Sequence, residues 1–322
     1  MNLAGIIGAL LICIVWIDFL RRLDIFEAEK WIFTIMATGL GAVFTLLWSF
    51  GLAVIPPYEE AFLPLIRELL WSFGLEVPLT FLRPDESTTG MYLFFILMVG
   101  LPEELVKIIP VFIMLYYTDE LDEPYDYLKF AMCSALGFAT VENIQYFEHH
   151  GSSIIDKRAY LSVVGHLSFS CCMAYGVVRK RMFGRGTILG NILIFGTLSI
   201  LLHATFDTLL SVPAGNLIFI VFFYFLVIVL RNMINTTLNF SPWFSEDKFP
   251  KIKTAFRFLI LGLLAVFFYA MLVITLENGT EAGIAFLVDN IILSGTLIFF
   301  IPSRLSGMVL ERNSRVNILS RK

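Results

Sequence analysis

Two stretches, Leu101-Pro102-Glu103-Glu104-Leu105-Val106-Lys107 and His203-Ala204-Thr205-Phe206-Asp207, decide how this sequence folds. Both place ionisable side chains inside long apolar runs. A charge at the centre of a membrane helix costs about 2.5–3.5 kcal/mol, so such residues are rare in membrane spans and are usually functional. The two stretches therefore indicate helices that cross a membrane and carry a polar site within it.

The composition agrees with a membrane location. The chain has 322 residues, of which 58% are apolar and 16% are charged, and its mean hydropathy is +0.81. Soluble domains have about 45–50% apolar and about 25% charged residues. The apolar runs are continuous and do not alternate as in a membrane barrel. The predicted fold class is all-α, a polytopic helix bundle in a lipid bilayer. A net charge of −4 leaves no basic patch for nucleic acid.

The apolar runs predict about nine transmembrane helices. The predicted spans are residues 2–20, 31–55, 91–117, 127–147, 159–178, 187–212, 215–232, 255–276 and 283–301. Gly100 and Pro102 are expected to break the third span just before Glu103. Segment 57–84 contains several prolines, and its middle predicts an amphipathic helix on the outer membrane face. A re-entrant piece or a gate over a membrane cavity is the alternative.

The distribution of Lys and Arg predicts an N-terminus outside and a C-terminus inside. With that orientation the inner loops and the tail contain 17 basic residues and the outer loops contain 4. The tail residues Arg304, Arg312, Arg315, Arg321 and Lys322 are expected to anchor the inner face. The chain is accordingly divided into three parts. Residues 1–90 form two helices and the outer segment, 91–212 a four-helix catalytic core, and 213–322 three accessory helices and the tail.

Polar residues are concentrated in spans three to six. They are Glu103, Glu104, Lys107, Glu142, His166, His203 and Asp207. At about 1.5 Å per residue, most of them lie at similar depths in the outer half of the membrane, so they are expected to meet in one cavity. Lys107 lies four positions after Glu103 and three after Glu104, and it is expected to neutralise either one. Asp289 in the ninth span has no such neighbours in the pattern.

Three further residues are predicted to support this site. Lys107 supplies the positive charge, Asn143 follows Glu142, and Ser170 lies one turn after His166. The span that carries Glu142 is rich in small residues, which predicts close backbone packing at the centre of the bundle.

This set of side chains suits hydrolysis. A desolvated glutamate can act as a general base towards water, and a histidine can donate to a developing oxyanion. Alternatively, Glu104, His166 and His203 hold a zinc ion that activates the water. A proton- or ion-coupled transporter that uses the same groups as a relay remains an alternative, as does a catalytically silent scaffold of the same fold.

The order of these motifs resembles the PrsW family of intramembrane proteases, which is related to the CAAX prenyl proteases. The resemblance rests on Glu-Glu-x-x-Lys at 103–107, Phe138-Ala139-Thr140-Val141-Glu142-Asn143, His166, and His-x-x-x-Asp at 203–207. It covers residues 91–212. It implies that Glu103 activates water beside Glu104, and that His203 and Asp207 support the attack or the oxyanion.

The resemblance also bears on substrate and cofactor. Glu142 stands where CAAX proteases have a histidine, which argues against prenylated substrates. The family is associated with cutting a single-span membrane protein, such as an anti-sigma factor, on the outer side of the bacterial cytoplasmic membrane. Its members are often described as metalloproteases, whereas the CAAX relatives resemble metal-free, glutamate-dependent enzymes. Both mechanisms stay open for this chain.

Overall fold

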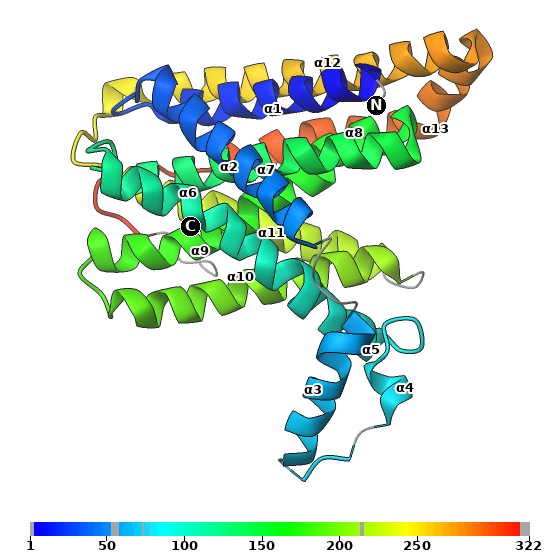
Figure 1. Cartoon of the computed structure of the whole chain (residues 1–322). Coiled ribbons are helices and arrows are strands. Elements are labelled where there is room, and N and C mark those ends of the chain that lie inside the picture. The colour runs from blue at the N-terminus through cyan, green and yellow to red at the C-terminus, as the bar shows by residue number, and fades with distance from the viewer. Residues whose placement is uncertain (1–2, 53–57, 73, 77, 213–215, 316–322) are drawn as a thin grey trace.

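The protein folds into a bundle of long helices with a smaller helical arm (Figure 1). The computed structural model describes residues 3–52, 58–72, 74–76, 78–212 and 216–315, and these contain no β-strand. The parts of the predicted spans and of the tail that fall on other residues, including Arg321 and Lys322, lie outside the described residues. The long helices are α1 (Leu3–Leu23), α2 (Trp31–Leu52), α6 (Leu101–Tyr117), α7 (Pro124–His150), α9 (Val163–Arg181), α10 (Ile188–Ser211), α11 (Asn216–Asn239), α12 (Pro250–Asn278) and α13 (Thr280–Leu305).

The all-helical membrane fold is confirmed, with a smaller number of clear spans than expected. Seven helices of the described chain are long and apolar enough to cross a membrane. The predicted count of nine is not confirmed. The two predicted spans outside that set are 91–117 and 127–147, which carry Glu103, Glu104, Lys107 and Glu142. The other two helices of the polar site, α9 and α10, are among the seven candidate spans.

The expected break at Gly100 and Pro102 is wrong. The helical path continues from α5 (Thr88–Phe94) through the π-helical segment η1 (Phe95–Gly100) into α6. Pro102 lacks an N–H group and its ring crowds the carbonyl one turn earlier, which normally kinks a helix. Here the wider i→i+5 turns of η1 directly precede Pro102, and such segments are often found at functional sites. Gly100 remains important because α10 approaches it, with the carbonyl oxygen of Ile200 3.1 Å from where a Cβ would be.

Helix α7 is the centre of the bundle, as its small residues predict. Every residue from Pro124 to Ala139 is buried, and α7 packs against α1, α2, α6 and α9. Two glycines allow α2 and α7 to cross at backbone distance. A Cβ on Gly137 would overlap the carbonyl oxygen of Thr38, and a Cβ on Gly41 would overlap that of Ser134. This crossing fixes the height of α7, and therefore of Glu142.

The arm at the lower right of Figure 1 contains α3 (Tyr58–Ser72) and α4 (Leu79–Leu82). The helix predicted within 57–84 is therefore present. Leu63 and Leu82 are buried together, whereas Leu65, Leu69 and Trp71 are exposed. An exposed apolar face on a helix outside the bundle is typical of a segment that lies in a membrane interface. Its placement on the outer membrane surface stays a prediction.

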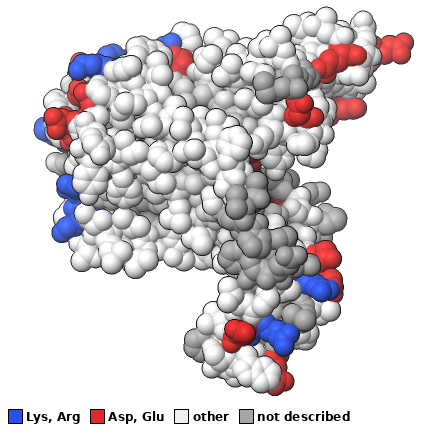
Figure 2. Space-filling view, in the orientation of Figure 1, with Lys and Arg blue, Asp and Glu red and all other residues white. Residues whose placement is uncertain are grey.

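Charged side chains are gathered at the ends of the bundle. Figure 2 shows Lys and Arg mainly at one end, on the left, with a broad uncharged surface between that end and the other. A buried ion cluster lies at the same end. The ammonium group of Lys129 contacts carboxylate oxygens of Asp24 at 2.7 Å and of Asp126 at 3.3 Å. Glu123 caps α7 and accepts a hydrogen bond from the Ser241 hydroxyl, so the cluster ties three segments of the chain together.

This cluster predicts a pH-dependent stability. Burial, together with the neighbouring Asp126 carboxylate, raises the pKa of Glu123 to about 8. An unfolded glutamate has a pKa near 4.3, so the folded protein binds the additional proton between these values. The stabilisation of the fold by protonated Glu123 is complete below about pH 4 and is lost as the pH rises through about 8. Thermal unfolding in detergent should therefore show a falling midpoint over this range. Glu123→Gln should flatten the curve, whereas Asp119→Asn, at an exposed position nearby, should not.

Candidate active site

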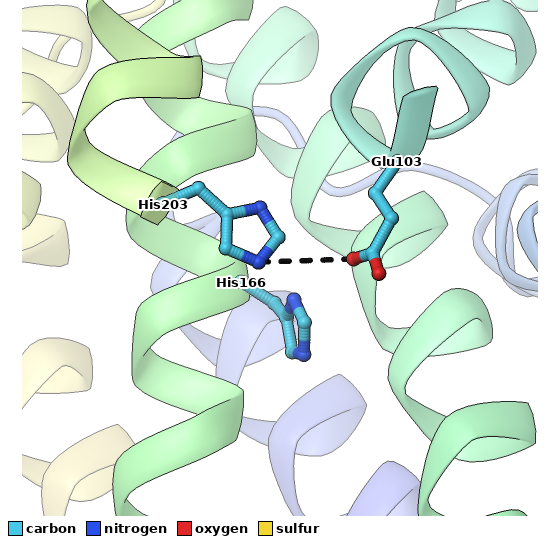
Figure 3. Close-up of side chains that lie close together, drawn as sticks. All are labelled: Glu103, His166 and His203. Atoms are coloured by element: carbon cyan, nitrogen blue, oxygen red, sulfur yellow. Dashed lines mark ion pairs between the residues drawn. The ribbon is translucent and has the colours of Figure 1, made fainter. Parts of the chain in front are cut away.

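The predicted site residues of four helices meet in one place. Glu103, Glu104 and Lys107 come from α6, Glu142 from α7, His166 from α9, and His203 and Asp207 from α10. Figure 3 shows the Glu103 carboxylate directed towards the rings of His166 and His203. The expected convergence of these groups is present in the structure.

Lys107 occupies the middle of the cluster. Its Nζ lies 2.8 Å from Glu104 Oε1, 3.2 Å from Glu103 Oε2 and 3.1 Å from His166 Nδ1. The side chain is fully buried and its ammonium stands 4.1 Å from the centre of the Phe138 ring. Lys107 therefore contacts both glutamates at once and offsets one of their two negative charges inside the bundle.

The two adjacent glutamates have different environments. Glu104 is fully buried, and its Oε1 accepts a hydrogen bond from His203 Nδ1 at 2.9 Å. Its Oε2 accepts one from the Ser199 hydroxyl at 3.2 Å. Glu103 keeps 14% of its side chain exposed and reaches a cavity. Glu103 is thus placed to meet a substrate or water, and Glu104 is placed to orient His203.

The cavity has a volume of about 570 Å³. Five predicted site residues line it. They are Glu103, Glu142, His166, His203 and Asp207. Apolar side chains form much of the remaining wall, among them Phe95, Val99, Leu161, Phe206 and Leu210. An apolar wall around a few convergent polar groups is the usual form of a ligand site.

The orientation of His203 follows from its neighbours. A carboxylate only accepts hydrogen bonds, so the contact with Glu104 places the proton on Nδ1. The ring also stacks on Phe169, with 4.7 Å between ring centres. The other nitrogen, Nε2, lies 3.7 Å from Glu103 Oε2 and 3.4 Å from Asp207 Oδ2. In this position Nε2 either carries a proton that the two carboxylates attract or offers its lone pair to a cation bound between them.

The donor set fits a metal ion in type and number. Glu103, His166 and His203 each offer one ligand atom within 4.8 Å of the others. Two ligands of tetrahedral zinc lie roughly 3.3 Å apart, close to the separation of Glu103 and His203. A metal-binding histidine typically donates its other N–H to a carboxylate, as His203 does to Glu104. The structure thus groups Glu103 with the two histidines, whereas the sequence suggested Glu104 as the carboxylate ligand.

The predicted supporting residues Asn143 and Ser170 lie in different environments. Asn143 Oδ1 accepts a hydrogen bond from Arg158 Nε at 2.7 Å. The Ser170 hydroxyl is buried, has no hydrogen-bond partner among the described residues, and does not line the cavity. Asp289 is exposed on α13. None of the motifs predicted a role for Arg158, which donates to Glu142 Oε2 at 2.6 Å. In the sequence Arg158 reads as an ordinary basic residue of an outer loop.

The fold and the site together define a class of protein. The chain is a polytopic helical membrane protein with a carboxylate and imidazole centre that faces a cavity between its helices. A family model described as PrsW family intramembrane metalloprotease matches residues 29–231. The chain belongs to this family. The match contains the whole region 91–212 on which the resemblance was based.

Individual relatives agree with this assignment. The chain is 42% identical over 76 residues to Protease PrsW of Geobacillus kaustophilus, which covers 24% of this chain and 34% of the relative. It is 33% identical over 122 residues to Protease PrsW of Shouchella clausii, covering 36% and 53%. Protease PrsW of Bacillus subtilis is 29% identical over 122 residues, covering 38% and 56%. The chain thus spans between a third and just over half of the length of these relatives. No solved structure matches it.

Proposed function

We propose that this protein is an intramembrane endopeptidase that hydrolyses peptide bonds of single-span membrane proteins near the outer face of the bacterial cytoplasmic membrane. The observation that carries the proposal is the meeting of Glu103 and His203 in one cavity. They come from different helices, and Glu104 and Lys107 hold them from behind. The relatives named Protease PrsW support the same activity.

We assign one task to each group in this proposal. Glu103 accepts a proton from a water molecule in the cavity while the water oxygen attacks the peptide carbonyl carbon. The same proton then passes to the departing amine, so that Glu103 returns to its ionised form. His203, held by Glu104, faces the region where the oxyanion forms. Alternatively, a zinc ion held by Glu103, His166 and His203 would lower the pKa of the attacking water, and Glu103 would then be a ligand and not the base. Lys107 offsets part of the carboxylate charge throughout.

The position of the cavity supports cleavage near the outer face. His150, Ile154 and Lys157, from the loop predicted to lie outside, line the cavity together with Ser211 at the end of α10. The basic end of the bundle in Figure 2, which the positive-inside rule places in the cytoplasm, contains the α9–α10 connection. A transmembrane substrate such as an anti-sigma factor would thus present its outer juxtamembrane segment to the site.

A comparison of membrane proteomes tests the activity. Cells that produce the wild type or Glu103→Gln at matched levels are compared by quantitative mass spectrometry of their membranes. We expect a small set of single-span proteins to remain uncut in the variant, with loss of their outer fragments. Identical proteomes would contradict the proposal and would bring forward uptake assays in proteoliposomes.

Metal removal is expected to stop cleavage. A chelator that strips zinc from the purified protein should abolish cleavage of a substrate identified in this way, and added zinc should restore it. His166→Ala and His203→Ala should each lower the amount of zinc bound, measured by elemental analysis. Full cleavage by metal-depleted protein would instead leave the glutamate-only mechanism, with Glu103 as the base.

A further inference from the structure

We propose that Arg158 is a positioning residue of this site, which holds Glu142 against His166 and thereby fixes the tautomer and the direction of the His166 ring. The inference rests on the proposed function, since it gives Arg158 a task in the same centre. The contacts run from Arg158 to Glu142, from Glu142 to His166, and from His166 to Lys107. Neither the motifs nor the family description assigns a role to this arginine.

The guanidinium group of Arg158 forms hydrogen bonds with two residues of α7. Its Nη2 donates to Glu142 Oε2 at 2.6 Å and its Nε donates to Asn143 Oδ1 at 2.7 Å. Its Cζ atom also lies 3.9 Å from the centre of the Tyr146 ring. Only 13% of the Arg158 side chain is exposed. Two donors in a rigid fork, together with a flat face against an aromatic ring, are features that lysine does not offer.

The Glu142 oxygen that accepts from Arg158 also contacts His166. Glu142 Oε2 lies 2.9 Å from His166 Nε2, and His166 Nδ1 lies 3.1 Å from Lys107 Nζ. An ionised carboxylate only accepts hydrogen bonds, and an ammonium only donates them. In the metal-free site both contacts are therefore satisfied by one form of the ring, the neutral tautomer with its proton on Nε2 and its lone pair on Nδ1. A zinc ion held by His166 would use this Nδ1 lone pair in place of the contact with Lys107. Glu142 can select this tautomer because its hydrogen bond from Arg158 holds the carboxylate oxygen against the His166 ring.

The backbone around Arg158 brings it to the correct face. Arg158 begins the π-helical segment η3 (Arg158–Ser162), which runs directly into α9. Arg158 and His166 are eight positions apart, which would separate their directions by about 80° in a continuous α-helix. An i→i+5 turn takes up one residue more than an i→i+4 turn, so η3 brings both side chains to the same side. Both line the cavity.

The neighbouring cation offers a matched comparison. Lys157 also lines the cavity, yet the hydrogen bonds that the described structure gives to Glu142 come from Arg158 and His166. Removing either residue takes one positive charge from the lining of the cavity. Only the removal of Arg158 releases Glu142. Lys157→Met is therefore the control for Arg158→Met.

The test uses nitrogen NMR of the histidine rings. The chain has 4 histidines, so a full-length protein labelled with ¹⁵N only at histidine gives a spectrum in which His166→Ala identifies the signals of His166. We expect the wild type and Lys157→Met to show His166 with its proton on Nε2. Arg158→Met should show a mixture of tautomers, and Arg158→Lys an intermediate spectrum. Cleavage of a substrate should fall roughly 10–100-fold in Arg158→Met, the usual effect of losing a residue that orients a site histidine.

The outcomes separate the two proposals. If folded Arg158→Met keeps the His166 signals of the wild type, the positioning role is wrong whatever the cleavage assay shows. If Arg158→Met does not fold, Arg158→Lys decides, because wild-type signals and wild-type cleavage in that variant would overturn the need for the fork. A changed tautomer without any Glu103-dependent cleavage would keep the role of Arg158 and reject the protease.

Discussion

Glu103→Gln is expected to abolish peptide hydrolysis while the protein still inserts and folds. Glutamine keeps the shape of the side chain and the reach into the cavity, but it neither takes a proton from water nor supplies a charged metal ligand. General base catalysis contributes roughly 10²–10⁴-fold, so the cleavage rate of a purified substrate should fall by at least that range. Single-turnover cleavage in detergent or liposomes measures it. The thermal unfolding midpoint should change little, since Glu103 makes one hydrogen bond, to Lys107.

Two further variants, Asp289→Asn and Glu104→Gln, test whether the loss of cleavage is specific to Glu103. Asp289→Asn changes another acid of a predicted span, one that is exposed on α13, and should leave cleavage intact. Glu104→Gln should also reduce cleavage, but with a greater loss of stability, because this side chain is fully buried and holds Lys107, Ser199 and His203. Normal cleavage by Glu103→Gln would remove Glu103 as both base and ligand.

Gly137→Ala is expected to have the largest effect on the fold. The additional methyl group would meet the Thr38 carbonyl oxygen, a backbone atom that cannot rotate away. Overpacking of a core costs about 1–3 kcal/mol, and a clash between two backbones should lie at the upper end of this range or beyond it. The measurement is the thermal unfolding midpoint in detergent, together with the amount of folded protein recovered from membranes.

Gly39→Ala is the matched control for this prediction. Gly39 lies on α2 near the same crossing, but no atom stands within 4 Å of the position of its missing Cβ. Alanine is favoured over glycine within a helix by up to about 1 kcal/mol, so this change should be neutral or stabilising. Equal behaviour of the two variants would contradict the close crossing of α2 and α7.

The sequence predicted which polar residues lie together better than it predicted the path of the chain. Ionisable residues inside apolar runs are costly, so their positions alone indicated which helices face one another. The position of Lys107 between two glutamates followed from helical spacing. The difference between Glu103 and Glu104 in exposure could not be read in advance, because adjacent residues on a helix differ only in what packs against them.

The π-helical segments and the contacts of Arg158 were not predicted from the sequence, for a related reason. The π-helical segments before Glu103 and before His166 leave no clear mark in hydropathy, since they change hydrogen bonding and not composition. The expected break at Pro102 and the overlooked Arg158 both follow from treating these stretches as ordinary helix and loop. An arginine beside a predicted outer loop is normally a solvated charge, and only the tertiary fold shows its contacts with Glu142 and Asn143.

The arrangement of charges on α6 also bears on how the chain enters the bilayer. Glu103, Glu104 and Lys107 lie within about one turn of a single helix, so their ion pairs form as soon as that helix forms. The later helices that supply His166 and His203 are not required for this. A nascent α6 therefore presents the translocon with one net negative charge in place of three separate charges. Insertion of the segment can precede assembly of the active centre, and synthesis from the N-terminus imposes that sequence of events.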